Sequence, residues 1–184
     1  MQPTAPSSTE VQNESDMLKS GHQNQNMGGE KAMLNFNTHL SGGNEVPAVE
    51  TDATGQAIFQ LSNDGMKLSY KLIVANIKNV KMAHIHVGSA DENGPVVVWL
   101  YPPAPPPELI EGRTQGVLQE GVITKDDLVG QLKGKKLWDL VEMMKNKQTY
   151  VNVHTKQYPA GEIRGQIMMN GKMKKGNGKM MNGK

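Results

Sequence analysis

Three histidines occupy positions from which their side chains could converge on one metal ion. His84 and His86 lie in the strand-like run 82–88. Because side chains alternate along a strand, both imidazoles project from one face about 6.5 Å apart, while Ile85 and Val87 face the other way. Two imidazoles so placed can chelate one metal. The alternative, a pair of hydrogen-bonded histidines with no ligand, is the less favoured interpretation of a His-x-His spacing.

A third histidine ends a second run with the same alternation. In the run 150–154, Asn152 and His154 share one face with the first residue, and two valines share the other. If the two runs are neighbouring strands, the three imidazoles form one site. Glu162 and Arg164, which share a face in the next run, would lie beside it.

The composition restricts what these residues could bind. The chain contains no Cys, which excludes disulfides, iron–sulfur clusters, thiolate zinc sites and cysteine nucleophiles. Neutral imidazoles without thiolates favour copper, with zinc as the alternative. No fourth ligand is evident: His39 and Glu162 are candidates, and water would otherwise take that position.

Arg164 has two interpretations. Its guanidinium could guide a small anion such as superoxide toward a redox-active metal, which would be a catalytic role. It could instead form an ion pair with Glu162, two residues away on the same strand face. The sequence leaves both open.

Methionines near the C-terminus form a second set of candidate metal ligands. They are Met168, Met169, Met173, Met180 and Met181. Thioether sulfur favours Cu(I), so clustered Met would suit copper capture or delivery. The segment 168–184 also carries five Lys and no acid, so the alternative is a basic tail that adheres to anionic polymers or lipid headgroups.

A single β domain must position these residues. The length of 184 residues suits one core, and the composition predicts a disordered polar linker at 1–32, a domain at 33–168 and a disordered tail at 169–184. Short alternating runs predict strands at 33–40, 56–62, 67–73, 83–87, 95–100, 150–154 and 162–168.

A short helical insert is predicted before the last hairpin. Thr124 and Asp127 have the form of a capping box. Apolar residues at 137, 140, 141 and 144 recur with helical spacing, and this helix should end near Asn146. The expected fold is mainly β, an antiparallel Greek-key-like β-sandwich.

Several functions are excluded by what the sequence lacks. The near-neutral segment 32–167 offers no basic face for nucleic acid. No apolar run approaches the length of a transmembrane segment. A hydrolase is disfavoured because there is no Gly-x-Ser-x-Gly elbow or phosphate-binding loop. Nothing in the pattern specifies an oligomeric state.

Four motifs in register resemble the CHRD domain, the module first named from chordin. They are the segments Leu40–Pro47, Ala83–Gly88, Asn93–Val98 and Tyr150–Thr155, the last followed by Gly161–Ile167. The resemblance spans about residues 33–167. It implies β structure and export, as in chordin, a secreted growth-factor antagonist, or in microbial proteins that carry a single copy after an export signal. An extracellular, periplasmic or cell-surface location is therefore expected.

The order of the candidate residues is also distantly similar to that of copper–zinc superoxide dismutases. These Greek-key sandwiches carry His-x-His on one strand, a later copper-binding His, and then an Arg that guides the anion. His84, His86, His154 and Arg164 follow that order. The chain lacks the disulfide, the zinc loop and a bridging His, so the similarity implies a copper-only site.

Two classes of function follow from these observations. The leading hypothesis is an exported copper-binding protein, active in copper handling or in redox chemistry on small oxygen species such as superoxide. The alternative is a non-catalytic extracellular module that binds a protein or matrix partner, with Trp99 and Tyr101 beside the Pro-rich loop as its contact surface.

Overall fold

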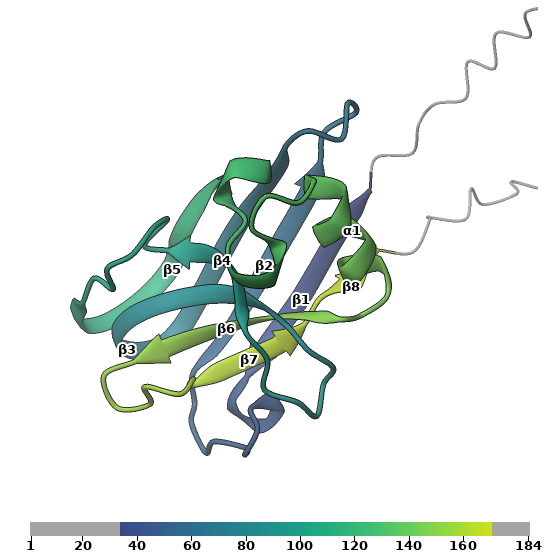
Figure 1. The fold of residues 1–184 in the computed structure, drawn as a ribbon. Helices are drawn as coiled ribbons and strands as arrows, with labels where there is room; N and C mark the ends of the chain where they lie inside the picture. The colour runs from purple at the N-terminus through teal and green to yellow at the C-terminus, as the bar shows by residue number, and fades with distance from the viewer. Residues whose placement is uncertain (1–33, 171–184) are drawn as a thin grey trace, which may run out of the picture. The chain divides into compact units, whose positions relative to one another are not determined.

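Antiparallel strands make up most of residues 34–170, the part of the chain that the computed structural model describes (Figure 1). The strands are β1 (Asn35–Ser41), β2 (Thr54–Leu61), β3 (Leu68–Val87), β4 (Val96–Tyr101), β5 (Ile110–Ile123), β6 (Thr149–Thr155), β7 (Ile163–Gln166) and β8 (Met168–Met169). The helices are the α-helix α1 (Leu137–Lys145) and three single 3₁₀ turns, η1 (Gly42–Asn44), η2 (Lys125–Asp127) and η3 (Gly130–Leu132). The prediction of a mainly β, antiparallel fold is confirmed.

The sheet closes on itself. β1 pairs with β2, β2 with β3, β3 with β6, β6 with β7, and β7 with β1, so these five strands form a ring. The other strands attach at its sides, β4 and β5 to β3 and β8 to β1. The predicted Greek-key-like sandwich is not confirmed, because all eight strands belong to one hydrogen-bonded sheet around a barrel-like core.

β3 is the strand that joins the two sides of the ring. Its first part pairs with β2 and β5, and its last part pairs with β6 and β4. Between them the register shifts, and Asn76 and Asn79 adopt positive φ angles of 57° and 55°. Figure 1 shows β3 curving from β2 and β5 toward β6. The strands predicted at 67–73 and 83–87 are therefore two ends of one strand.

The core lies inside the ring and follows the predicted alternation. Phe36 of β1, Phe59 of β2 and Ile85 of β3 are fully buried, and removal of such apolar surface from water is the main stabilising term. The helix predicted around 137–144 is confirmed as α1, which buries the four apolar residues that defined it. The Thr124–Asp127 capping box is also confirmed, at the start of η2.

Among the described residues, no helix combines the length and the apolar character that crossing a membrane requires.

Candidate metal centre

The structure brings His84, His86 and His154 together. β3 and β6 are neighbours, with His84 opposite Asn152 and Met82 opposite His154. The Nδ1 atom of His84 lies 3.2 Å from Nε2 of His154, and one ring nitrogen from each of the three histidines lies within 4.8 Å of the others. The alternation of side chains therefore places the three imidazoles on one face, while Ile85 enters the core.

Backbone carbonyls determine which ring nitrogens are free. Nδ1 of His86 lies 2.8 Å from the carbonyl oxygen of Gly94, and Nδ1 of His154 lies 3.0 Å from that of Pro159. A carbonyl oxygen can only accept, so each Nδ1 carries the hydrogen and each Nε2 keeps its lone pair. Metal-binding histidines commonly donate a hydrogen bond from the N–H of their second ring nitrogen in this way.

The free ring nitrogens have unsatisfied bonding capacity. Nε2 of His84 and Nε2 of His86 are buried without a hydrogen-bond partner. Two imidazoles on one tetrahedral ion, each at about 2.0–2.1 Å from it, would have their nitrogens about 3.3 Å apart. The 3.2 Å separation between Nδ1 of His84 and Nε2 of His154 is close to that spacing. In the metal-free protein it is a hydrogen bond in which the N–H of His84 donates to Nε2 of His154. The residues present therefore fit a metal ion held by three nitrogen atoms.

Burial keeps the three imidazoles neutral. It lowers the pKa of His84 from 6.5 to about 3, with the neighbouring His154 and His86 acting in the same direction. It lowers the pKa of His154 to about 4, against the opposing effect of the hydrogen bond to Pro159. The pKa of His86 is also lowered, mainly by burial. Neutral imidazole is the form that binds metal, and the three rings are in this form at pH 7.

The other candidate ligands lie apart from this group. His39 is exposed on β1, opposite Gln56 of β2. Glu162 is buried, but its Oε1 accepts a hydrogen bond from Thr51 at 2.8 Å and its Oε2 accepts one from Thr155 at 2.7 Å. Neither residue belongs to the cluster of metal-binding side chains that the described part of the chain contains.

The methionine candidates fall in two places. Met168 and Met169 form β8, are exposed, and pair with Asn37 and Phe36 of β1. β8 is the last strand of the described sheet. Met173, Met180 and Met181 lie outside the described residues.

Arg164 is hydrogen-bonded to the loop that connects β3 and β4. Its guanidinium donates to the carbonyl oxygens of Ser89 and Glu92, each at 2.7 Å, and to Oδ1 of Asn93 at 3.0 Å. The side chain is only 1% exposed. Within residues 34–170, Arg164 and Glu162 form no ion pair, because each holds a different loop.

Two aromatic side chains that the sequence did not assign to the site lie against it. Trp99 of β4 pairs with His84 and meets its ring edge-on, with the centroids 4.3 Å apart. Tyr150 stacks on His86 at 4.9 Å and an interplanar angle of 10°. The register between β3, β4 and β6 would have identified both residues, but pairing partners are not readable from one sequence.

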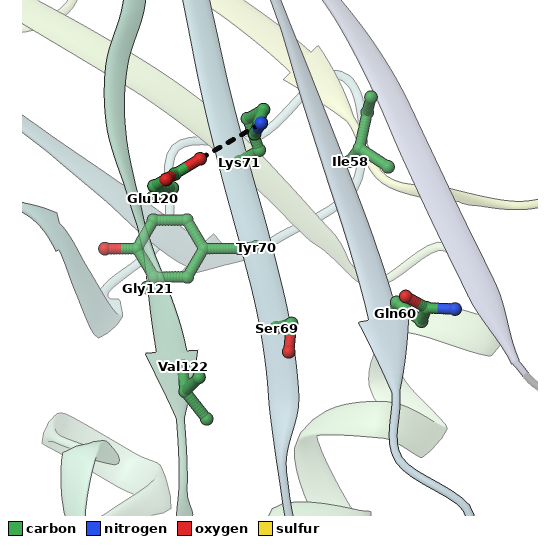
Figure 2. Close-up of a pocket in the computed structure, with 8 residues that line it drawn as sticks. All are labelled: Ile58, Gln60, Ser69, Tyr70, Lys71, Glu120, Gly121 and Val122. Atoms are coloured by element: carbon green, nitrogen blue, oxygen red, sulfur yellow. Dashed lines mark ion pairs between the residues drawn. The ribbon is translucent and has the colours of Figure 1, made fainter.

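A surface pocket of about 520 Å³ lies away from the histidines and is formed by β2, β3 and β5 (Figure 2). Figure 2 shows Lys71 and Glu120 paired across two strands, at 3.0 Å. Both are well exposed, and such surface ion pairs contribute little to stability. Glu120 is the one carboxylate among the residues that line this pocket, and no histidine lines it.

The fold and the site define a closed antiparallel β domain with a buried group of three neutral histidines. The family model of the CHRD domain matches residues 36–167, and the chain belongs to the CHRD domain family. The resemblance found in the four motifs is thereby confirmed. Comparison with curated proteins gave no match, and neither did comparison with solved structures.

Proposed function

We propose that this protein binds one copper ion through His84, His86 and His154. The observation that carries the proposal is the convergence of three buried, neutral imidazoles, two of which have their lone pair placed on Nε2 by hydrogen bonds from Nδ1 to backbone carbonyls. Leaving buried polar atoms without partners is costly. A bound metal would satisfy the unpartnered Nε2 of His86 and would replace the hydrogen bond between Nδ1 of His84 and Nε2 of His154.

Copper is favoured over zinc by the donor set. For a nitrogen site, the affinity of divalent first-row metals is highest for Cu²⁺ and lower for Zn²⁺. The chain has no Cys to favour a structural zinc site. Bound copper would supply one-electron chemistry between Cu(I) and Cu(II). We also propose that the protein is exported, as the family resemblance implies.

Metal holding is favoured over chemistry on superoxide. Anion guidance requires a guanidinium that a dissolved anion can reach. Three acceptors of the 89–93 loop already engage Arg164, and its side chain is almost fully buried. We therefore propose copper handling as the function. Copper-dependent superoxide dismutation that is lost in Arg164→Ala, with copper still bound, would reverse this preference.

The first experiment is a copper titration of protein purified without metal-affinity resin and treated with a chelator. We expect one tightly bound Cu(II) with an electron paramagnetic resonance spectrum showing nitrogen ligands. His84→Ala and His154→Ala should each weaken copper binding at least about 100-fold, because the two histidines that remain provide two nitrogen ligands in place of three. The matched control is His39→Ala, since His39 is exposed on β1.

The two tryptophans of the chain provide a local reading of the same titration. Trp99 contacts His84, whereas Trp138 lies exposed on α1 with Lys145 over its ring. Cu(II) at the three histidines should quench the emission of Trp138→Phe strongly and that of Trp99→Phe weakly. Unchanged binding in both histidine variants would overturn the proposal, and tighter binding of Zn²⁺ than of Cu²⁺ would overturn the choice of metal.

A further inference from the structure

Arg164 fixes the segment that receives the ring hydrogen of His86. Its guanidinium donates hydrogen bonds to Ser89, Glu92 and Asn93 in the loop between β3 and β4. The next residue, Gly94, provides the carbonyl oxygen that accepts from Nδ1 of His86 at 2.8 Å. The position of this carbonyl therefore depends on three hydrogen bonds from one buried side chain.

Tyr150 binds the backbone N–H of Gly94, the residue whose carbonyl accepts from His86. Its hydroxyl oxygen accepts the backbone N–H of Gly94 at 3.1 Å. The ring of Tyr150 stacks on His86 and also contacts the Arg164 guanidinium, whose Cζ atom lies 3.4 Å from the ring centroid. His86 and Arg164 come from the strands on either side of β6. Arg164, Tyr150 and the loop thus form one connected support for His86.

Glu162 has the corresponding position for His154. Its Oε2 accepts the hydroxyl hydrogen of Thr155 at 2.7 Å, and the Thr155 hydroxyl oxygen accepts the backbone N–H of Tyr158 at 3.1 Å. The next residue, Pro159, provides the carbonyl oxygen that accepts from Nδ1 of His154 at 3.0 Å. The loop between β6 and β7 is therefore held by a buried carboxylate, as the 89–93 loop is held by Arg164.

We infer that Arg164 and Glu162 are positioning residues of the metal centre, each anchoring the loop whose carbonyl fixes the hydrogen of one histidine on Nδ1. Arg164 acts on His86, and Glu162 acts on His154. The two residues are separated only by Ile163, which is buried in the core. One short segment at the start of β7 thus supports two of the three metal-binding rings from two different loops.

This arrangement presets the metal-free protein for binding. With the hydrogen held on Nδ1, the lone pair of Nε2 points to the common site before any metal arrives. Loss of such outer contacts commonly weakens metal binding by about 10–100-fold. The inference rests on the proposed metal site for its functional meaning, but the position of the ring hydrogens is a property of the protein without metal.

The test is nitrogen NMR of the full-length, metal-free protein with ¹⁵N-labelled histidine at pH 7. Long-range ¹H–¹⁵N correlations report which ring nitrogen of each histidine carries the hydrogen. We expect Nδ1–H for both His86 and His154 in the natural protein. Arg164→Lys should give a mixture of the two forms for His86 and leave His154 unchanged. Glu162→Gln should do the reverse.

Milder variants address the same contacts if either protein folds poorly. Tyr150→Phe removes the acceptor of the Gly94 N–H and should affect His86 alone. Thr155→Val removes the hydroxyl between Glu162 and Tyr158 and should affect His154 alone. Arg113→Lys and Glu120→Gln, at exposed positions of β5, are the matched controls and should change neither ring.

The outcomes separate this inference from the proposed function. Unchanged ring hydrogens in all four variants would overturn it, and so would equal changes at both histidines, which indicate general loosening. Selective changes together with a 10–100-fold loss of Cu(II) affinity would support both ideas. Selective changes in a protein that binds no copper would support the positioning roles and refute the metal site.

Discussion

A buried imidazole serves as a metal ligand when it is uncharged and when its lone pair faces the site. At the scale of single residues, both conditions arise here from different causes. Burial lowers the pKa values of His84 and His154 to about 3 and 4. The carbonyls of Gly94 and Pro159 hold the ring hydrogens away from the common centre. A third requirement is that the rings lie close together, and the positions of the histidines on the strand faces supply it.

Glu45 is a buried carboxyl group for which we expect an effect of pH on stability. It is buried, and its Oε1 has no hydrogen-bond partner. Burial raises its pKa from 4.5 to about 7, although Arg164 acts in the opposite direction. The folded protein therefore holds a proton on Glu45 that the unfolded chain has released. Its contribution to stability is present below pH 4.5 and is lost as the pH rises to 7.

The substitution Glu45→Gln should remove this dependence, because the amide is neutral at every pH. We expect the free energy of unfolding of the variant to exceed that of the natural protein by about 3 kcal/mol at pH 8, and the two to converge near pH 4. Urea denaturation at both pH values measures this difference, and the buried histidines contribute equally to both proteins. A difference that does not change with pH would contradict the prediction.

At the scale of elements, closure of the ring depends on the contact between β7 and β1. Gly165 of β7 lies where a Cβ atom would collide with the carbonyl oxygen of His39 and the hydroxyl of Thr38, both on β1. We expect Gly165→Ala to destabilise the protein by about 2–4 kcal/mol, because the backbone of β7 cannot approach β1 as closely.

The matched control for this substitution is Gly43→Ala. A Cβ at Gly43 would meet no heavy atom within 4 Å, and it lies in the short η1 turn after β1. Denaturation midpoints at pH 7 distinguish the two variants. Equal midpoints for Gly165→Ala and Gly43→Ala would mean that closure does not depend on this contact.

Elements with one strongly buried face could be predicted from the sequence. The alternation of β1 and β2 and the helical spacing of α1 are visible because each buries a regular set of apolar residues. The same alternation in β3 and β6 placed the three histidines on matching faces. Proximity of the rings then required only that the two strands be neighbours, which the register confirms.

Other elements left no such pattern. β5 exposes most of its length, and Gly112 and Gly116 adopt positive φ angles of 79° and 103°, so its apolar alternation is broken. The continuity of β3 was hidden by Asn76 and Asn79, which interrupt its regular backbone. The roles of Arg164 and Glu162 could not be predicted, because the carbonyls they position belong to loops whose conformation is set by tertiary contacts.

At the scale of the whole molecule, a bound metal would link two strands distant in the sequence. His84 and His86 lie at the end of β3, and His154 lies near the end of β6. The apolar core is extensive, so we expect the metal-free protein to fold. Copper should add stability by binding only the folded state.

Copper at about 100 times its dissociation constant should stabilise the folded state by about 2.7 kcal/mol. For a domain of this size we expect the midpoint of thermal unfolding to rise by roughly 10 °C, and a chelator should reverse the rise. His39→Ala should show the full increase, and His154→Ala should lose most of it, because two remaining histidines bind copper more weakly. An undiminished increase in His154→Ala would mean that the stabilising copper binds at another site. The exposed Met168 and Met169 of β8 would then be the first candidate ligands to substitute.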